Sequence, residues 1–127
     1  MSRSIAREKV FKLVFEYVFN NEENNLLLAE TIEELKDEEP YIRDVYFGVI
    51  KHYDELCEFI SNSAKGFSFK RLFKIDIAIL LVALYEIKYI DEIPIKVSIN
   101  EALNLAKSYS TEKSNKFING ILSNLVN

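Results

Sequence analysis

The stretch IPIKVSINEALNLAKSYSTEKSNKFINGILSNLV, residues 93–126, decides the fold. Pro94 ends the element before it, because proline has no N–H to donate and restricts the preceding residue to extended geometry. Ser98 and Glu101 have the spacing of a capping box, so we expect a helix that begins at Ser98. Thr111 is the expected cap of a second helix. Two antiparallel helices joined tightly are therefore predicted, the second with an apolar stripe of Phe117, Ile118, Ile121, Leu122 and Leu125.

Length and composition predict a single all-α domain. The chain has 127 residues, only three glycines and two prolines, and little β-type alternation. Its most apolar run, residues 77–84, is far shorter than the roughly 20 residues that a membrane span needs, so it predicts a central buried helix. The N-terminus has no hydrophobic signal core, and the single Cys57 cannot form an internal disulfide. We therefore expect a cytoplasmic protein without a membrane segment.

Working outward from residues 93–126, periodicity and capping residues place the remaining helices. A first helix is expected from Ser2 or Ser4 to about Phe19, and a second over residues 25–36. The acids and the proline of residues 37–40 predict a helix start, followed by one long helix over residues 41–62. Ser68 is the expected cap of a short turn over residues 70–73, which leads into the apolar helix 75–89. A hinge near Gly66 divides the domain into two helical subdomains, 1–64 and 65–127.

The first helix has apolar residues around most of its circumference, more than one core-facing stripe requires. Two interpretations stay open: some of its aromatic residues are exposed or lie at a partner interface, or the helix is buried all round.

Charge is distributed unevenly along the chain. The net charge is −4, yet residues 21–40 alone carry eight acids against one lysine. The positive excess lies at the two ends of the chain, in residues 3–12 and 96–116. If the fold brings these ends together, they form a modest site for an anionic ligand on an otherwise acidic protein.

Residues of the kind that enzymes and metal sites use are scarce. His52 is the only histidine and there is no CxxC pair, so we expect neither a metal site nor another cofactor. The sequence also lacks a nucleophile elbow, a P-loop and a Rossmann glycine pattern. We therefore expect a protein that is not an enzyme. Cys57 lies on the apolar stripe of its helix and is expected to be a small buried hydrophobe rather than a reactive thiol.

Residues 93–122 closely resemble the C-terminal signature of the NusB family, the bacterial transcription antitermination factors. The family pattern is P-x-K-V-A-I-N-E-A-[IV]-E-L-A-K-x-[FY] followed by S-x-K-F-V-N-G-[VI]-L. Two further segments, residues 6–15 and 83–87, resemble the family's first helix and its buried A-[LV]-Y-E-[LI] helix. The matching positions of the signature are Pro94, Lys96, Val97, Ile99, Asn100, Glu101, Ala102, Leu105, Ala106, Lys107, Ser114, Lys116, Phe117, Asn119, Gly120 and Leu122.

This resemblance implies a compact bundle of about seven helices in two subdomains. It also implies a function without covalent chemistry: binding of boxA, a short single-stranded RNA element of ribosomal RNA leaders, together with NusE, a small-subunit ribosomal protein. The complex joins the elongating RNA polymerase with other Nus factors and promotes read-through of terminators. Some members of the family form homodimers, and the sequence leaves this open here.

Site residues follow from the same resemblance, because single-stranded RNA is held by cationic, aromatic and hydrogen-bonding side chains. The NusE contacts implied are Phe15 and Asp76. Each RNA candidate has a structural alternative: an internal salt bridge from Arg7 to an acid of the long third helix, a core position for Phe117, or close helix packing at Asn119 and Gly120. The RNA candidates are Arg3, Arg7, Lys12, Lys113, Lys116, Phe117 and Asn119.

Two departures from the family pattern bear on affinity. Ser4 and Ile5 stand where members often carry consecutive arginines, which implies weaker RNA binding by the protein alone and more dependence on NusE. Lys113 occupies a position that is often acidic and is expected to restore part of that affinity. Two rival functions remain: a helical adaptor that binds protein only, and a relative of the N-terminal domain of ribosomal RNA cytosine methyltransferases. The chain ends at Asn127 without room for a catalytic domain, which counts against the second.

Overall fold

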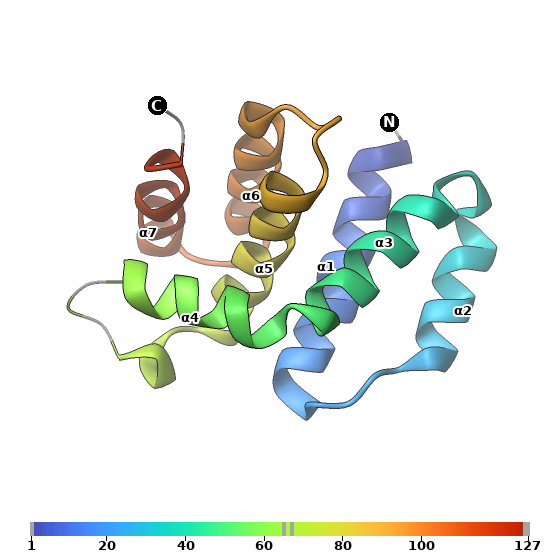
Figure 1. Cartoon of the computed structure of the whole chain (residues 1–127), viewed down its shortest axis with the longest axis horizontal. Coiled ribbons are helices and arrows are strands. Elements are labelled where there is room, and N and C mark those ends of the chain that lie inside the picture. The colour runs from blue at the N-terminus through green and yellow to red at the C-terminus, as the bar shows by residue number, and fades with distance from the viewer. Residues whose placement is uncertain (1, 65, 67, 126–127) are drawn as a thin grey trace.

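Seven α-helices and two 3-10 turns form the computed structural model, which describes residues 2–64, 66 and 68–125 (Figure 1). No strand occurs within these ranges, so the predicted all-α bundle of about seven helices is confirmed. The division at residues 64 and 65 stays a prediction, since Lys65 lies outside the described ranges. The elements are α1 (Ser2–Asn20), α2 (Asn25–Glu34), η1 (Lys36–Glu38), α3 (Glu39–Lys51), α4 (Tyr53–Ser63), η2 (Phe69–Arg71), α5 (Lys74–Tyr89), α6 (Ile95–Tyr109) and α7 (Glu112–Ser123).

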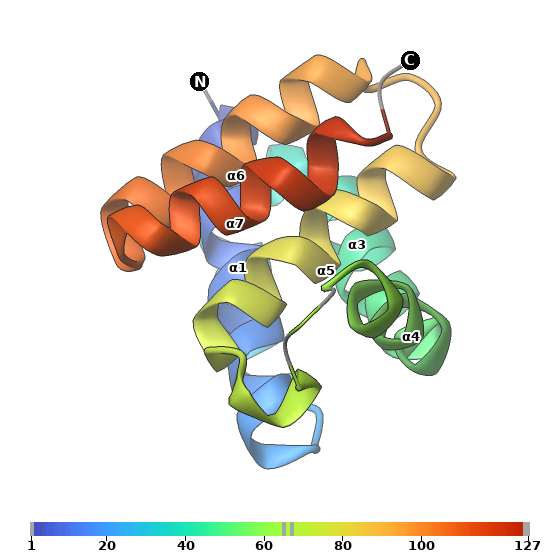
Figure 2. The same ribbon diagram turned by 90° about the vertical axis from the view of Figure 1, so that its left-hand side faces the viewer.

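Helix α5 is the centre of the molecule. Its residues 76–86 are all buried, as a helix that is apolar on every side requires. It contacts α1, α3, α4, α6 and α7, and it runs antiparallel to α1, with the hairpin of α6 and α7 lying across the pair (Figures 1 and 2). The predicted central helix and the predicted antiparallel pair at the C-terminal end are both confirmed. Thr111 caps α7 as expected, because its hydroxyl accepts from the backbone N–H of Ser114 at 3.0 Å.

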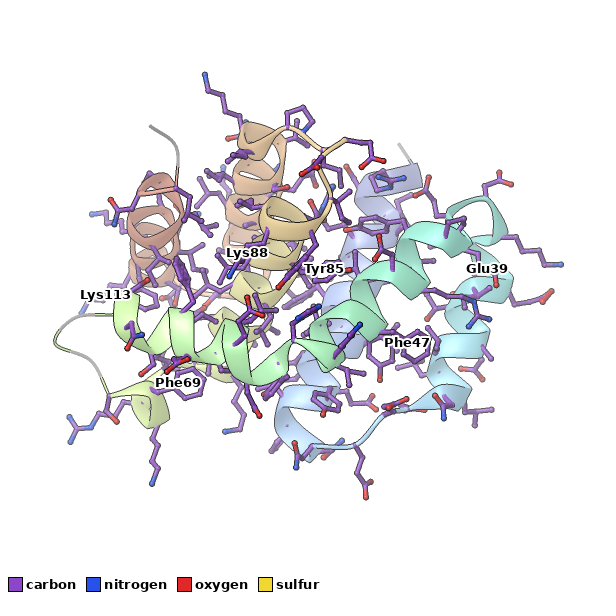
Figure 3. All side chains as sticks on the ribbon, viewed as in Figure 1. Glu39, Phe47, Phe69, Tyr85, Lys88 and Lys113 are labelled. Atoms are coloured by element: carbon purple, nitrogen blue, oxygen red, sulfur yellow. The ribbon has the colours of Figure 1, made fainter. Side chains whose placement is uncertain are left out.

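Helices α3 and α5 approach closely at Gly48. A Cβ built on this glycine would lie 2.1 Å from Cζ of Tyr85, well inside van der Waals contact. Tyr85 lies between α5 and α3, where its hydroxyl donates to Oδ1 of Asp44 at 2.6 Å (Figure 3). Gly48 is therefore the position that lets the tyrosine ring occupy the interface between the two helices.

The expected long helix over residues 41–62 is wrong, since the chain breaks at His52 into α3 and α4. His52 has φ −104° and ψ 21°, outside the helical region, and its ring stacks on Tyr89 with centroids 4.3 Å apart. The apolar spacing continues through the break, which is why periodicity did not reveal it. His52 therefore lies at the boundary between two helices.

Two predicted caps are also wrong. Helix α6 begins at Ile95, directly after Pro94, and Ser98 lies within it. The Ser98 hydroxyl donates to the buried Glu86 instead of capping a helix end. Ser68 precedes the short turn η2 but makes no side-chain cap bond.

The first interpretation of helix α1, in which some of its aromatic residues are exposed, is confirmed, and burial all round is wrong. Phe11, Leu13 and Val14 are buried, whereas Phe15 is only half-buried and Phe19 is 64% exposed. The N-terminal half of the helix is therefore core, and its C-terminal end presents aromatic surface.

Candidate nucleic-acid interface

A buried polar network holds the N-terminal half of α1 in place. Its centre is Glu86 of α5, whose side chain is fully buried. Arg7 of α1 donates to both carboxylate oxygens, from Nε at 2.7 Å and from Nη2 at 3.2 Å. Tyr41 of α3 donates to the same carboxylate, and Ser98 of α6 donates to it at 2.7 Å. Four helices thus meet at one carboxylate, as a buried charge requires full pairing.

Arg7 is itself buried in this network and reaches a second acid, with Nη1 3.4 Å from Oε1 of Glu101 on α6. Burial by itself lowers the pKa of Arg7, but the hydrogen bond to Glu86 and the neighbouring negative charges raise it overall, so the guanidinium stays charged. The alternative of an internal salt bridge is therefore the one observed, although its acids lie on α5 and α6 and not on the expected third helix. Direct RNA contact by Arg7 stays a prediction.

Arg3 lies one turn before Arg7 and faces solvent. Its Nε is 2.5 Å from Oε1 of Glu38, and its guanidinium carbon lies 4.3 Å from the centroid of the Tyr41 ring. The same ring lies 5.6 Å from the guanidinium carbon of Arg7. The Tyr41 hydroxyl is bound to Glu86, and the pKa of this phenol is raised by burial first and by the Glu86 charge second, so it remains a neutral donor.

Lys12 is the third candidate on α1 and is exposed. Its ammonium lies 5.5 Å from the centroid of the Tyr109 ring, at the end of α6. The Tyr109 hydroxyl in turn donates to Glu8. These contacts place Lys12 where α1 meets the outer surface of α6.

Helix α7 presents its three polar candidates to solvent. Lys113, Lys116 and Asn119 are exposed, and within the described residues none of these side chains has a hydrogen bond or ion pair. Figure 3 places Lys113 at the edge of the molecule, on the side of α7 away from α1. Phe117 is half-buried and packs against the hydrophobic core, as its structural alternative proposed.

Gly120 does not serve close helix packing. It is exposed, and a Cβ built on it meets nothing within 4 Å. A glycine inside a helix lowers stability by about 1 kcal/mol relative to alanine, and packing within the protein does not explain why a glycine stands at this position. The interpretation of Asn119 and Gly120 as a packing pair is therefore wrong for Gly120.

The fold brings the two cationic ends together only in part, because α6 lies between them. Helix α6 packs against α7 and bonds to α1 through Glu101, which accepts from the Ser4 hydroxyl at 3.1 Å. Its exposed face carries Asn100, Asn104 and Lys107 at helical spacing. These side chains connect the α1 candidates to the α7 candidates, and sequence reasoning missed them as a site. Their spacing opposite the apolar stripe of α6 is the signal that would have found them.

A groove of about 520 Å³ lies on this surface where α6 turns into α7. It is of a size that accommodates a small ligand or a nucleotide base. One amide on its wall, Asn115, donates to the backbone carbonyl of Leu103 at 3.1 Å and so joins the two helices. The groove is lined by Leu103, Asn104, Lys107, Ser110, Thr111, Glu112 and Asn115.

Of the two residues expected to contact NusE, Phe15 lies toward the end of α1 and Asp76 in the first turn of α5. Phe15 is half-buried and its ring lies 6.2 Å from that of Phe19. Asp76 is buried, with its carboxylate accepting from the hydroxyls of Ser110 at 2.7 Å and Ser114 at 2.6 Å. The acid therefore fixes the turn between α6 and α7 against α5. A direct NusE contact by either residue stays a prediction.

The described residues also bear on metal binding, membrane insertion and thiol chemistry. They contain no group of three histidine, cysteine or acidic side chains that could hold a metal ion. No helix among them is long and apolar enough to cross a bilayer. Cys57 is half-buried and packs against the core, and its burial raises the pKa of the thiol to about 11, which makes the thiolate scarce at neutral pH.

An all-helical bundle with exposed lysines and amides on three adjacent helices is typical of small helical proteins that bind nucleic acid. Residues 4–127 match the NusB family model. The chain belongs to the NusB family of transcription antitermination factors.

Relatives and a solved structure match this chain over almost its whole length. The transcription antitermination protein NusB of Agathobacter rectalis is 41% identical over 97% of this chain and 98% of its own length. That of Bacillus subtilis is 38% identical over 98% of this chain and 95% of its own length. The structure of T. maritima NusB aligns with a TM-score of 0.83 at 33% identity, covering 97% of this chain and 89% of that one.

Proposed function

We propose that this chain binds boxA-type single-stranded RNA of ribosomal RNA leaders together with NusE, and acts by binding alone. The complex then joins the elongating RNA polymerase through other Nus factors, which places the protein in the cytoplasm. One observation carries the proposal: on a protein of net charge −4, the exposed faces of α1, α6 and α7 display lysine, arginine and asparagine side chains. Cations of this kind hold phosphates, and amides bind the exposed edges of unpaired bases.

We propose two different parts for the candidate residues. Arg3, Lys12, Lys116 and Asn119 are exposed and suited to direct contact. Arg7 is suited to positioning, because its buried pair with Glu86 fixes the first turns of α1 that carry Arg3. The outer face of α6 adds the amide side chains of Asn100 and Asn104 and the ammonium of Lys107.

Fluorescence anisotropy with a labelled boxA-type RNA tests this proposal, using a scrambled RNA of the same length as reference and measuring with and without the cognate NusE. We expect selective binding that becomes tighter with NusE. Arg3→Ala and Lys116→Ala should each weaken binding, and Lys116→Ala should lower the salt slope by about 0.7, the value for one lost phosphate contact on a single strand. Lys51→Ala, an exposed lysine of α3, is the matched control.

Equal binding of boxA and scrambled RNA in both conditions would contradict the RNA proposal and favour the protein-only adaptor. Equal losses of RNA affinity in Lys51→Ala and Lys116→Ala would contradict the proposed site, because they would show that overall charge, and not this surface, determines binding.

For NusE we propose the aromatic end of α1 together with the start of α5. These helices are antiparallel, so Phe19 at the end of α1 and Phe73 before α5 lie at the same end of the pair (Figure 1). They are 64% and 58% exposed, respectively, and exposed aromatic residues are typical of protein interfaces. Phe19→Ser should abolish the NusE-dependent gain while leaving RNA binding of the free protein unchanged. Leu26→Ser, which removes an even more exposed apolar side chain from α2, is the control.

A further inference from the structure

The exposed cation of the first turn of α1 is already neutralised within the protein. Arg3 Nε lies 2.5 Å from Oε1 of Glu38, and the side chains are 44% and 15% exposed. Glu38 ends η1, in the acidic segment of residues 21–40. Another acid of that segment, Glu34, lies 3.9 Å from the ammonium of Lys9. The acidic segment therefore reaches the cationic side of α1 at two points.

We propose that Glu38 competes with RNA phosphate for Arg3 and thereby lowers the affinity of this protein for RNA. The inference rests on the proposed function, since it concerns the same RNA-binding surface. Glu38 lies outside that surface and, by pairing with Arg3, determines how much positive charge Arg3 presents to a ligand.

The geometry of the pair explains why the two acceptors compete. An arginine binds phosphate most strongly through two parallel N–H donors, and the side-on arrangement uses Nε. In this protein Nε is occupied by the Glu38 carboxylate. A phosphate that approaches Arg3 either displaces Glu38 or lies beside a second negative charge, and both outcomes reduce the free energy of binding.

The ring of Tyr41 strengthens the competition. It lies 4.3 Å from the guanidinium carbon and is fixed by its hydrogen bond to Glu86, so Arg3 is held on the side where Glu38 meets it. Stacking of this kind favours one orientation of the guanidinium. The cation is therefore directed at Glu38 before any RNA arrives.

The next residue provides a matched control. Glu39 has the same charge, but its side chain is 41% exposed and its carboxylate pairs with Nε of Arg43 at 2.7 Å, within α3. Glu38→Gln and Glu39→Gln change the net charge equally, and only the first releases Arg3.

The test is the RNA titration described above, applied to the full chain with urea unfolding curves to show that each variant is folded. Glu38→Gln should bind boxA-type RNA about threefold to tenfold more tightly, the range expected from losing one partly exposed ion pair and one nearby like charge. Its salt slope should become steeper by about 0.7. Glu39→Gln should stay within about twofold of the wild type. In an Arg3→Ala background, Glu38→Gln should give no gain.

Three results would overturn the inference. Weaker or unchanged binding by Glu38→Gln would show that the carboxylate positions Arg3 for RNA or has no effect on it. An equal gain in Glu39→Gln would assign the effect to overall charge, and a gain that persists with Arg3→Ala would remove Arg3 from the explanation. Wild-type RNA binding with any of these results leaves the proposed function standing, whereas absence of binding in the wild type and in Glu38→Gln overturns both.

Discussion

Replacing Gly48 with alanine adds one methyl group where α3 meets α5. The new Cβ would lie 2.1 to 2.4 Å from three atoms at the end of the Tyr85 side chain, so the ring has to move. Tyr85 is almost fully buried and its hydroxyl is bound to Asp44, which limits where it can go. We therefore expect Gly48→Ala to destabilise the fold even though alanine is the better helix former.

The magnitude follows from three contributions. Overpacking a buried contact costs about 1–3 kcal/mol. Moving the ring off Asp44 costs about 1 kcal/mol for the lost hydrogen bond. Alanine in place of glycine inside a helix returns about 1 kcal/mol. The net expectation is a loss of about 1–3 kcal/mol in the free energy of unfolding, or roughly 4–10 °C in the melting temperature of a domain of this size.

Gly120→Ala is the matched experiment, because it is the same substitution within a helix at a position where the added Cβ meets nothing. We expect it to stabilise the protein by up to about 1 kcal/mol. Urea unfolding followed by circular dichroism measures both variants, and equal m-values would show that the denatured states are comparable. Tyr85→Leu, combined with Gly48→Ala, should recover part of the loss. Equal stabilities of Gly48→Ala and Gly120→Ala would refute the reasoning.

Three further predictions concern buried polar groups. Arg7→Met should lower the free energy of unfolding by about 3–5 kcal/mol, since it leaves Glu86 as an uncompensated buried charge. Arg43→Met, which breaks an exposed ion pair, should change it by less than about 1 kcal/mol. Equal urea midpoints for the two variants would contradict this. Asp76→Ala should lower the free energy of unfolding by about 2–3 kcal/mol, because the hydroxyls of Ser110 and Ser114 lose the carboxylate to which they donate. A thermal melt identical to that of the wild type would exclude this role for Asp76. Burial raises the pKa of Cys57 from about 9 to about 11, so iodoacetamide at pH 8 should alkylate the native thiol about 100-fold more slowly than the urea-unfolded one, as read by mass spectrometry. Because the folded pKa is the higher one, the stability that this thiol contributes is present below pH 9 and is lost as the pH rises to about 11; equal alkylation rates would contradict both statements.

Local signals in the sequence predicted most of the helices. They failed at positions whose conformation or hydrogen bonding is determined by tertiary contacts. The apolar run of α5 and the Thr111 cap are local features, and both were predicted correctly. The break at His52 is not local: the spacing of apolar residues passes through it, and its stacking partner Tyr89 lies 37 residues further along the chain. Ser98 resembles a cap by spacing, yet its hydroxyl is bound by Glu86 of another helix.

The candidate site shows the same limit. Exposure of Lys116 and Asn119 follows from their position opposite the apolar stripe of α7, which the sequence displays. The burial of Arg7 and Asp76 depends on acceptors and donors that come from distant helices, and a charged residue type gives no indication of it. The pairing of Arg3 with Glu38 likewise joins residues 35 positions apart.

The meeting of four helices at Glu86 has a consequence for how the chain matures during synthesis. Its carboxylate needs donors from residues 7, 41 and 98, so a nascent chain that ends before Ser98 has a charged group in its interior with a donor missing. Burial of the central helix is therefore unfavourable until α6 has left the ribosome. We expect nascent chains shorter than this to remain sensitive to protease, and resistance to appear abruptly once the last two helices are free to pack.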